Sequence, residues 1–269
     1  MYLGNFIKKL DKKYNKVYFS GIAFNSAKVK KDYIFFAIKG NNFDGNNYIQ
    51  EAIEKGAKVV VTEKKINFQN KEVIYLKSKN SRKLLAELSY KFIKKNVKKL
   101  IAVTGTNGKS SVADFYYQIL NLSKKRAASI GTIGIQSKNK KKEIKNTTLN
   151  PIELSKTINE LGFKKIDHII LEASSHGLKQ NRLDGLSFDL GIFTNLSHDH
   201  LDYHKNFRDY LNSKLYLFKN LIKKGGHVIL DSTIPQFKEI KKISIKKRLK
   251  LETVFGKNSD LELVTHIYK

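Results

Sequence analysis

The sequence predicts an α/β fold, with a small N-terminal α/β domain and a larger second domain built on a mostly parallel sheet flanked by helices. Short apolar runs alternate with helical patterns along most of the chain, as is typical of parallel sheets that are covered on both faces. One such run meets a glycine-containing turn and then a helical pattern at Leu100–Ser111. The length of 269 residues exceeds that of one average domain. We therefore predict domains at residues 1–97 and 98–269.

In the first domain, a strand is predicted at Tyr33–Ile38, because turn-forming residues follow it at 40–45. Apolar residues at helical spacing begin at Tyr48, and Gly56 stands where a helix commonly ends in the left-handed conformation. The other predicted elements of this domain are strands at 57–62 and 73–76 and a helix from an N-cap at Ser81 to Phe92.

The second domain is predicted to begin with a strand at Leu100–Val103 and a helix at Val112–Leu122. Asn150 and Pro151 are residue types preferred at the N-cap and the first position of a helix, so a helix is expected from there to Gly162. The other predicted elements are strands within 128–135 and at 166–171, 188–193 and 227–230, a lysine-rich loop at 137–145, a helix at 207–222 and a turn at Gly225-Gly226.

The composition is strongly basic, with 52 lysines and arginines against 24 acidic residues and a net charge of +28. Only five of the basic residues are arginines, and lysine doublets are spread along the whole chain. Nucleic-acid interfaces gather their charge and favour the arginine fork for base readout. Most of this charge is therefore predicted to be solvated surface that binds no nucleic acid. A basic protein also suits a strongly anionic substrate.

The composition also bears on location. No cysteine occurs, which excludes disulfides and thiolate metal sites and fits a reducing compartment. No stretch is apolar over the length of a transmembrane helix, and residues 1–19 lack the uncharged apolar core of a signal peptide. We therefore expect a cytoplasmic protein that does not insert into a membrane.

The glycine-containing turn predicts an anion site. A strand, a glycine turn and a helix N-terminus direct backbone N–H groups to one point, and the helix dipole favours negative charge there. Gly105 and Gly108 permit a tight backbone path. Lys109 can reach phosphate oxygens, and the Ser110 hydroxyl can bind Mg²⁺. Val103 stands where the general phosphate loop has its first glycine. The alternative is an ordinary glycine turn, but we favour a nucleotide-binding domain of the P-loop type.

Polar residues follow two further predicted strands, at Glu172–His176 and at Thr194–His200. Ligands bind beyond the carboxyl ends of parallel strands, so three strand ends, including the phosphate loop, are expected to converge on one crevice. Glu172 and one of His198 or His200 are candidate ligands of a Mg²⁺ ion that bridges ATP phosphates. The alternative is a structural role for the histidines.

Two motifs resemble the Mur ligases, the ATP-dependent ligases of peptidoglycan synthesis. Thr104–Lys109 resembles their phosphate loop, including its missing first glycine, and Asp199–Asp202 resembles the histidine motif of their central domain. Folylpolyglutamate synthases carry similar versions of both motifs. Asn146–Thr148, Glu172–Arg182 and Ser213-Lys214 are similar to the MurE-type branch, which adds the third residue of the stem peptide.

The resemblance runs from about residue 25 to residue 230 and implies an ATP-dependent amide-bond ligase. It implies addition of meso-diaminopimelate or lysine to UDP-N-acetylmuramoyl-L-alanyl-D-glutamate through an acyl-phosphate intermediate, with ATP and Mg²⁺ as cofactors. The implied partners are that UDP-muramoyl-dipeptide and a free amino acid, bound by a monomer. The alternatives are a ligase similar to folylpolyglutamate synthase and a lysine-rich nucleic-acid-binding module with a phosphate loop.

The resemblance also implies roles for individual residues. The ATP phosphates are assigned to Gly105, Thr106, Asn107, Gly108, Lys109, Ser110 and Ser111. Mg²⁺ is assigned to Ser110, Glu172, His200 and a carbamylated Lys214, and the catalytic group is Lys109, Glu172, His200 and Lys214. The substrate-binding positions are Ser26, Asn41, Asn42 and Phe43 in the first domain and Asn146, Thr147, Thr148, Ser174, Gln180 and Arg182 in the second.

Some of these positions depart from the family or have simpler alternatives. Asn25-Ser26-Ala27 stands where the family has Asp-Ser-Arg. Asn146–Thr148 could be a polar loop, and Gln180 and Arg182 a solvated turn. By spacing alone, Lys214 is one more lysine on an amphipathic helix.

The family also implies a third, C-terminal domain that closes over ATP and selects the amino acid, and we expect that domain to be absent from this sequence. The second domain is expected to be incomplete after Phe255. The chain alone is therefore expected to have little ligase activity.

Overall fold

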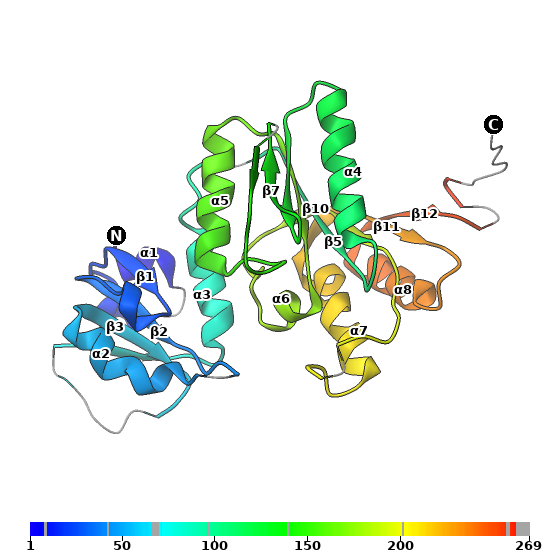
Figure 1. Cartoon of the computed structure of the whole chain (residues 1–269). Helices are drawn as coiled ribbons and strands as arrows, with labels where there is room; N and C mark the ends of the chain where they lie inside the picture. The colour runs from blue at the N-terminus through cyan, green and yellow to red at the C-terminus, as the bar shows by residue number, and fades with distance from the viewer. Residues whose placement is uncertain are drawn as a thin grey trace. The chain divides into compact units, whose positions relative to one another are not determined.

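The computed structural model describes residues 1–7, 10–41, 43–65, 70, 72–95, 97–138, 140–200, 202–256 and 259–261 (Figure 1). The chain divides into two compact units, Met1–Ile93 and Lys94–Lys269. The boundary lies slightly before the one expected between residues 97 and 98. Among the described helices, none combines the length and the apolar character that crossing a bilayer requires.

The first unit is built on a parallel sheet. In its described residues, four strands pair in the order β1 (Gly21–Ala23), β2 (Tyr33–Ala37), β3 (Ala57–Thr62) and β4 (Ile74–Lys77). Its helical segments are α1 (Leu3–Phe6), η1 (Lys12–Tyr14), η2 (Ser26–Lys28), η3 (Gly45–Tyr48), α2 (Ile49–Glu54) and α3 (Ser81–Tyr90). Phe35 of β2 and Val60 of β3 are fully buried in one core with Ile49 of α2. The predicted strands of this unit are thereby confirmed.

Single residues set the ends of two helices in this unit. After α2, Gly56 adopts a φ of +95° and donates its N–H to Ile53 O (2.8 Å), so the predicted glycine end is confirmed. The prediction for α3 was wrong by one residue. Its N-cap is Asn80, whose side chain accepts from Lys83 N (2.9 Å), and Ser81 is buried inside the helix. Asparagine and serine are equally good N-caps, so local sequence could not decide between them.

The second unit contains one large sheet. Within its described residues, eight strands are ordered β12–β11–β10–β5–β9–β6–β7–β8. Neighbours are parallel except at β6–β7 and β7–β8, which confirms the mostly parallel sheet. The strands are β5 (Lys99–Thr104), β6 (Ala127–Gly131), β7 (Gly134–Ser137), β8 (Lys140–Lys142), β9 (His168–Glu172), β10 (Phe188–Phe193), β11 (Ile222–Asp231) and β12 (Lys250–Val254).

Helices lie around this sheet (Figure 1). They are α4 (Lys109–Leu122), α5 (Pro151–Phe163), α6 (Ser175–Lys179), α7 (Phe207–Tyr216), the π-helical segment η4 (Leu217–Leu221) and α8 (Phe237–Lys247). α4 packs on β5, β6 and β9, with Ala113 against Val103 and Ile170. The predicted N-cap of α5 is confirmed, because the Asn150 side chain accepts from Glu153 N (3.0 Å).

Polar residues gather where the three central strands of the sheet, β5, β9 and β10, end. β5 pairs in parallel with β10 on one side and with β9 on the other. The phosphate loop follows β5, Glu172 ends β9, and the segment at 194–200 follows β10. These three chain segments therefore leave neighbouring strands at the same edge of the sheet, as the sequence predicted.

The strand expected within 128–135 is confirmed as β6, which turns at Gly131 and Gly134 into the antiparallel strand β7. Two other predictions in the second unit were wrong in detail. Part of the expected lysine-rich loop forms β8, which pairs with β7. The turn expected at Gly225-Gly226 lies inside β11, where the register against β10 shifts. The helix expected at 207–222 is confirmed in part, since η4 replaces its last turn.

Candidate functional site

The phosphate loop is fixed by the segment that follows β10. Gly105 has a φ of +149°, and a Cβ at this position would lie 1.9 Å from Thr194 Oγ1. Thr106 N donates to Asn195 O (2.9 Å), and Asn107 N donates to Asn195 Oδ1 (2.9 Å). Only glycine fits the first position, and tertiary hydrogen bonds hold the rest of the loop in place.

The same loop passes directly into α4. Gly108 is the N-cap at a φ of +80° and provides no capping side chain, so the first N–H groups of the helix remain available to an anion. Lys109, Ser110 and Ser111 form the first turn. Lys109 Nζ folds back and donates to Thr106 O (2.7 Å). The arrangement suits a phosphate chain that would replace these carbonyl contacts of the ammonium group.

A second lysine reaches this loop from α7. Lys214 is 1% exposed, and its Nζ donates to Gly105 O (2.6 Å). Burial, with the added repulsion of Lys109, lowers the pKa of Lys214 to about 7. Burial also lowers the pKa of Lys109, although the charges of Glu172 and Asp199 oppose that shift. Lys214 is therefore buried against the phosphate loop and is not a solvated lysine of an amphipathic helix.

Glu172 is buried at the end of β9 and is held by two neighbours. Ser110 Oγ donates to Glu172 Oε2 (3.0 Å), and Thr132 N donates to Oε1 (2.7 Å). A Cβ at Gly131 would lie 2.1 Å from Oε1, so the glycine makes room for the carboxylate. Sequence analysis missed Gly131 and Thr132, although a glycine–threonine turn at the end of a strand was a visible signal.

The predicted magnesium ligands are brought together only in part. Ser110 and Glu172 present oxygen atoms 3.0 Å apart, and oxygen ligands are those that Mg²⁺ prefers, so this pair fits the ion. Lys214 donates to the Gly105 carbonyl and makes no described contact with Ser110 or Glu172. The His200 ring meets those of His176 and Tyr210 instead. Among the described residues, no group of three or more histidine, cysteine, aspartate or glutamate side chains is arranged to hold a metal.

The histidines after β10 lie against aromatic rings. His200 meets the His176 ring edge-on, with centroids 4.9 Å apart, and has a φ of +54°. His198 packs on Phe207 at 4.8 Å. His204 is buried, and burial lowers its pKa to about 4. His176, His200 and His204 therefore form an imidazole cluster, from which His198 is separate in its contacts.

Five of the six second-unit residues predicted to bind substrate form one hydrogen-bonded network. Thr148 Oγ1 donates to Glu172 O (2.8 Å) and accepts from Ser174 N (3.0 Å). Ser174 Oγ caps α6 by accepting from Gly177 N (3.1 Å). Thr147 Oγ1 lies 3.1 Å from Thr132 Oγ1. The network therefore connects the predicted substrate positions to the buried carboxylate.

Arg182 and Gln180 extend this network and are not a solvated turn. Arg182 Nη1 donates to Thr148 O (2.5 Å), and its Nη2 donates to Gln180 Oε1 (2.8 Å). Gln180 Nε2 donates to the Tyr203 hydroxyl (3.1 Å), and the Tyr203 ring stacks on His176 at 3.9 Å. Sequence analysis missed Tyr203, which orients the amide of Gln180.

Asn146 is placed differently from its neighbours in sequence. It lines a separate pocket of about 420 Å³ together with Glu153 and Lys156 of α5. The predicted substrate-binding segment is thus divided between this pocket and the network around Thr148.

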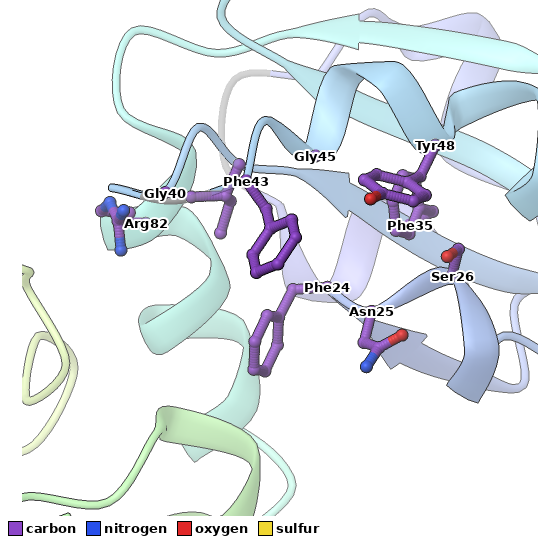
Figure 2. A pocket seen from close by; sticks show the side chains of 10 residues that line it. Phe24, Asn25, Ser26, Phe35, Gly40, Phe43, Gly45, Tyr48 and Arg82 are labelled. Atoms are coloured by element: carbon purple, nitrogen blue, oxygen red, sulfur yellow. The ribbon is translucent and has the colours of Figure 1, made fainter.

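The first unit has a pocket of about 400 Å³ (Figure 2). Ser26 and Phe43, two of the predicted substrate residues, line it, and Asn41 does not. Asn42 lies outside the described residues. Ser26 Oγ donates to Glu51 Oε2 (2.8 Å). The lining residues are Phe24, Asn25, Ser26, Phe35, Ile38, Gly40, Phe43, Gly45, Tyr48 and Arg82.

Comparison with known protein families identifies the class of protein. The Mur ligase middle domain matches residues 103–268, and the domain described as Mur ligase family, catalytic domain, matches residues 18–95. This chain belongs to the Mur ligase family.

Particular relatives share its sequence. The UDP-N-acetylmuramoyl-L-alanyl-D-glutamate–2,6-diaminopimelate ligase of Rickettsia montanensis is 42% identical over 247 residues, which is 90% of this chain and 51% of that protein. The ligase of the same name from Clostridium tetani is 40% identical over 232 residues, which is 82% of this chain and 47% of that protein. The chain thus spans about half the length of the curated relatives it matches.

Solved structures support the fold. A UDP-N-acetylmuramoyl-L-alanyl-D-glutamate–2,6-diaminopimelate ligase aligns with a TM-score of 0.82 at 24% identity, covering 94% of this chain and 52% of that one. The MurF ligase of Thermotoga maritima in complex with ADP aligns with a TM-score of 0.58 at 18% identity, covering 89% of this chain and 51% of that one. The two units of this chain therefore have the fold of Mur ligases.

Proposed function

We propose that this chain carries the nucleotide and muramoyl-peptide sites of an ATP-dependent ligase of peptidoglycan precursor synthesis. The reaction would join an amino acid to UDP-N-acetylmuramoyl-L-alanyl-D-glutamate. The observation that carries this proposal is the joint placement of the phosphate loop, the Ser110–Glu172 pair and the Thr148 network at one edge of the sheet. The names of the relatives favour 2,6-diaminopimelate as the amine and favour this function over the folate and nucleic-acid alternatives.

The chemistry requires an activated carboxylate, because a free carboxylate is a poor acceptor for an amine. Transfer of the ATP γ-phosphoryl group gives an acyl phosphate, and amine attack then expels phosphate and forms the amide. Phosphoryl transfer depends on positioning and charge neutralisation more than on a protein nucleophile. The N–H groups of residues 108–111 and the Lys109 ammonium would hold the phosphates. A Mg²⁺ ion on Ser110 and Glu172 would supply further charge neutralisation.

The Thr148 network is proposed to bind the peptide end of the muramoyl substrate. Arg182 provides a guanidinium whose orientation is fixed by Thr148 O and Gln180, and a fixed guanidinium suits a carboxylate of the dipeptide. Thr147 and Ser174 present hydroxyl groups on the same network. The pocket of the first unit, with Ser26 and Phe43 in its lining, is proposed to bind the uridine nucleotide.

Lys214 is proposed to act as a carbamate. A neutral lysine amine adds CO₂ and releases a proton, which gives an anionic oxygen ligand. The pKa of about 7 means that a substantial fraction of Lys214 is neutral near pH 7, unlike an ordinary lysine. The carbamate would also remove the repulsion between Lys214 and Lys109. His200 is proposed as a further metal ligand after rearrangement of the segment that follows β10.

Binding of the two substrates tests the proposed function. We expect saturable calorimetric binding of MgATP and of the UDP-muramoyl-dipeptide to the chain, and no saturable binding of a folate. Lys109→Met should weaken MgATP binding by at least about tenfold and leave the UDP-muramoyl-dipeptide affinity unchanged. Lys242→Met, which removes an exposed lysine of α8, is the matched control.

Three outcomes would contradict the proposal. They are equal binding of a folate, failure of both expected substrates to bind, and steeply salt-dependent binding of random DNA that Lys109→Met does not change.

A further inference from the structure

We propose that Arg82 is the residue by which the pocket of the first unit recognises the phosphate charge of its nucleotide. This inference rests on the proposed function, which places a uridine nucleotide in that pocket. Arg82 was not among the residues that sequence motifs indicated. It follows from how the pocket is built.

The pocket walls are aromatic and accessible. Phe24, Phe43 and Tyr48 are 40%, 72% and 39% exposed, and all three line the pocket. Figure 2 shows the rings of Phe24 and Phe43 turned toward the same space. Exposed aromatic faces provide stacking surfaces for a planar base, but they do not distinguish a nucleoside from a nucleotide. A cationic side chain beside these rings would supply that distinction.

The described lining contains one cation, Arg82, and no carboxylate. In Figure 2, Arg82 lies at one end of the pocket, beside Gly40, and Ser26 lies toward the other. A base that stacks between these ends would direct its phosphates toward the guanidinium or toward Ser26. The Ser26 hydroxyl already donates to Glu51, a carboxylate that also pairs with Lys55 (2.5 Å), so the Ser26 end offers a phosphate neither an unpaired cation nor this hydroxyl hydrogen. The charge pattern therefore places the phosphates at the Arg82 end.

The guanidinium is held in position before any ligand binds. Its Nη2 donates to Lys39 O (2.8 Å) on the chain that leads into the Gly40 turn. An arginine has five N–H donors in a planar fork, so this anchor uses one of them. The fork geometry matches two phosphate oxygens, and an anchored fork loses less conformational freedom on binding.

The competing explanation is structural, with Arg82 serving only to tie Lys39 O to α3. The two explanations differ in how binding depends on ligand charge. If Arg82 is only a structural tie, its loss weakens the binding of uridine, UMP and UDP alike, because every ligand depends on the shape of the pocket. If Arg82 recognises phosphate, its loss weakens the binding of UDP most and the binding of uridine least.

The test is titration of uridine, UMP and UDP into the whole chain by calorimetry. The wild-type chain is expected to bind UDP more tightly than UMP, and UMP more tightly than uridine. Arg82→Gln should weaken UDP binding by about tenfold to a hundredfold while changing uridine binding by less than about twofold. Arg82→Lys keeps the charge without the fork, so its UDP affinity should lie between those of the wild type and Arg82→Gln.

Two controls keep the result interpretable. Lys83→Gln removes the adjacent cation, which faces Glu87 (4.0 Å) and does not line the pocket, and it should leave all three affinities unchanged. Phe43→Ala should weaken the binding of uridine and the binding of UDP by the same factor. Circular dichroism should show that each variant remains folded.

Equal weakening of uridine and UDP by Arg82→Gln would overturn the inference in favour of the structural tie. So would a wild-type chain that binds uridine and UDP with equal affinity. If none of the three ligands binds the wild-type chain, the proposed uridine site in the first unit is contradicted as well. The MgATP measurements on the second unit are independent of this result.

Discussion

The phosphate loop of the second unit and the aromatic pocket of the first unit are both proposed to bind phosphate groups, but they are built differently. The loop is formed by consecutive residues whose backbone is fixed by Thr194 and Asn195. The pocket combines side chains from separated segments, such as Phe24 and Arg82. The first design depends on backbone geometry and buried charge, and the second on exposed rings and one guanidinium. Substitutions should therefore affect the two sites in different ways.

The largest effect is expected at Gly105. Gly105→Ala introduces a Cβ 1.9 Å from Thr194 Oγ1 at a φ of +149°, so both strain and overpacking act on the loop. We expect a loss of about 3 kcal/mol or more in the free energy of unfolding of the second unit, measured by denaturant unfolding.

Gly225→Ala is the matched control for that experiment. Gly225 also has a positive φ of +73°, but a methyl group added there would have no described atom within 4 Å. Its replacement should therefore cost only about 1 kcal/mol of backbone strain. Equal destabilisation by the two substitutions would show that the close contact with Thr194 does not limit the loop.

The next effect concerns the buried carboxylate. Glu172→Gln removes the negative charge beside Ser110 while keeping the shape of the side chain, so the preference of the site for Mg²⁺ should be lost. In the wild-type chain, Mg²⁺ should strengthen ATP binding by at least about tenfold. In the variant, ATP affinity should be nearly the same with Mg²⁺ and with EDTA. If the variant kept the full Mg²⁺ dependence of ATP binding, Glu172 would not be a ligand of the ion.

A third effect appears in the pH dependence of stability. Burial lowers the pKa of Lys214 from 10.5 to about 7 in the folded chain. Between these pH values the unfolded chain keeps a proton that the folded chain has lost, so this group makes stability rise with pH. Below pH 7 both states are protonated, and the penalty for the buried charge is complete.

Lys214→Met should remove that contribution. In CO₂-free buffer, the unfolding free energy of the wild type minus that of the variant should increase as the pH rises above 7. The increase should be at most about 1.4 kcal/mol per pH unit. The exposed Lys242→Met variant should follow the wild-type curve. A pH-independent difference for Lys214→Met would contradict the assigned burial effect.

The smallest effect is expected at Tyr203. Tyr203→Phe removes the hydroxyl that accepts from Gln180 Nε2 (3.1 Å) and leaves the ring stacked on His176. We expect the UDP-muramoyl-dipeptide affinity to fall by a factor of about five, equivalent to a hydrogen bond of about 1 kcal/mol, with MgATP affinity unchanged. Tyr2→Phe, at an exposed position, is the control. An equal change in MgATP affinity would indicate a general disturbance of the unit.

Local patterns were sufficient to predict several elements. The phosphate loop was predictable because strand, glycine turn and helix are consecutive, and α5 because Asn150 and Pro151 determine its start. β10 has the predicted bounds, Phe188–Phe193, since its apolar run is bounded by polar residues. The parallel pairing of β5 with β9 and β10 followed from the alternation of strands and helices.

Features that depend on tertiary neighbours were not predictable from local sequence. Gly225-Gly226 has the composition of a turn, but it lies inside β11 because the residues on both sides of it pair with β10. The lysines of β8 give no strand signal until β7 pairs with them. Gly131 matters only because Glu172 lies against it, and Arg82 reaches its pocket only because α3 carries it there. His200 was predicted to be a metal ligand, but no sequence signal indicated that its ring would lie against His176.

The central claim is that the three neighbouring strand ends form one nucleotide and metal site. Its most direct test is a crystal structure of the chain with a non-hydrolysable ATP analogue and Mn²⁺, whose anomalous signal locates the ion. The account predicts phosphates bound by the N–H groups of residues 108–111 and a manganese peak in contact with Ser110 and Glu172. Nucleotide or manganese bound elsewhere, with Ser110 still donating to Glu172, would contradict it.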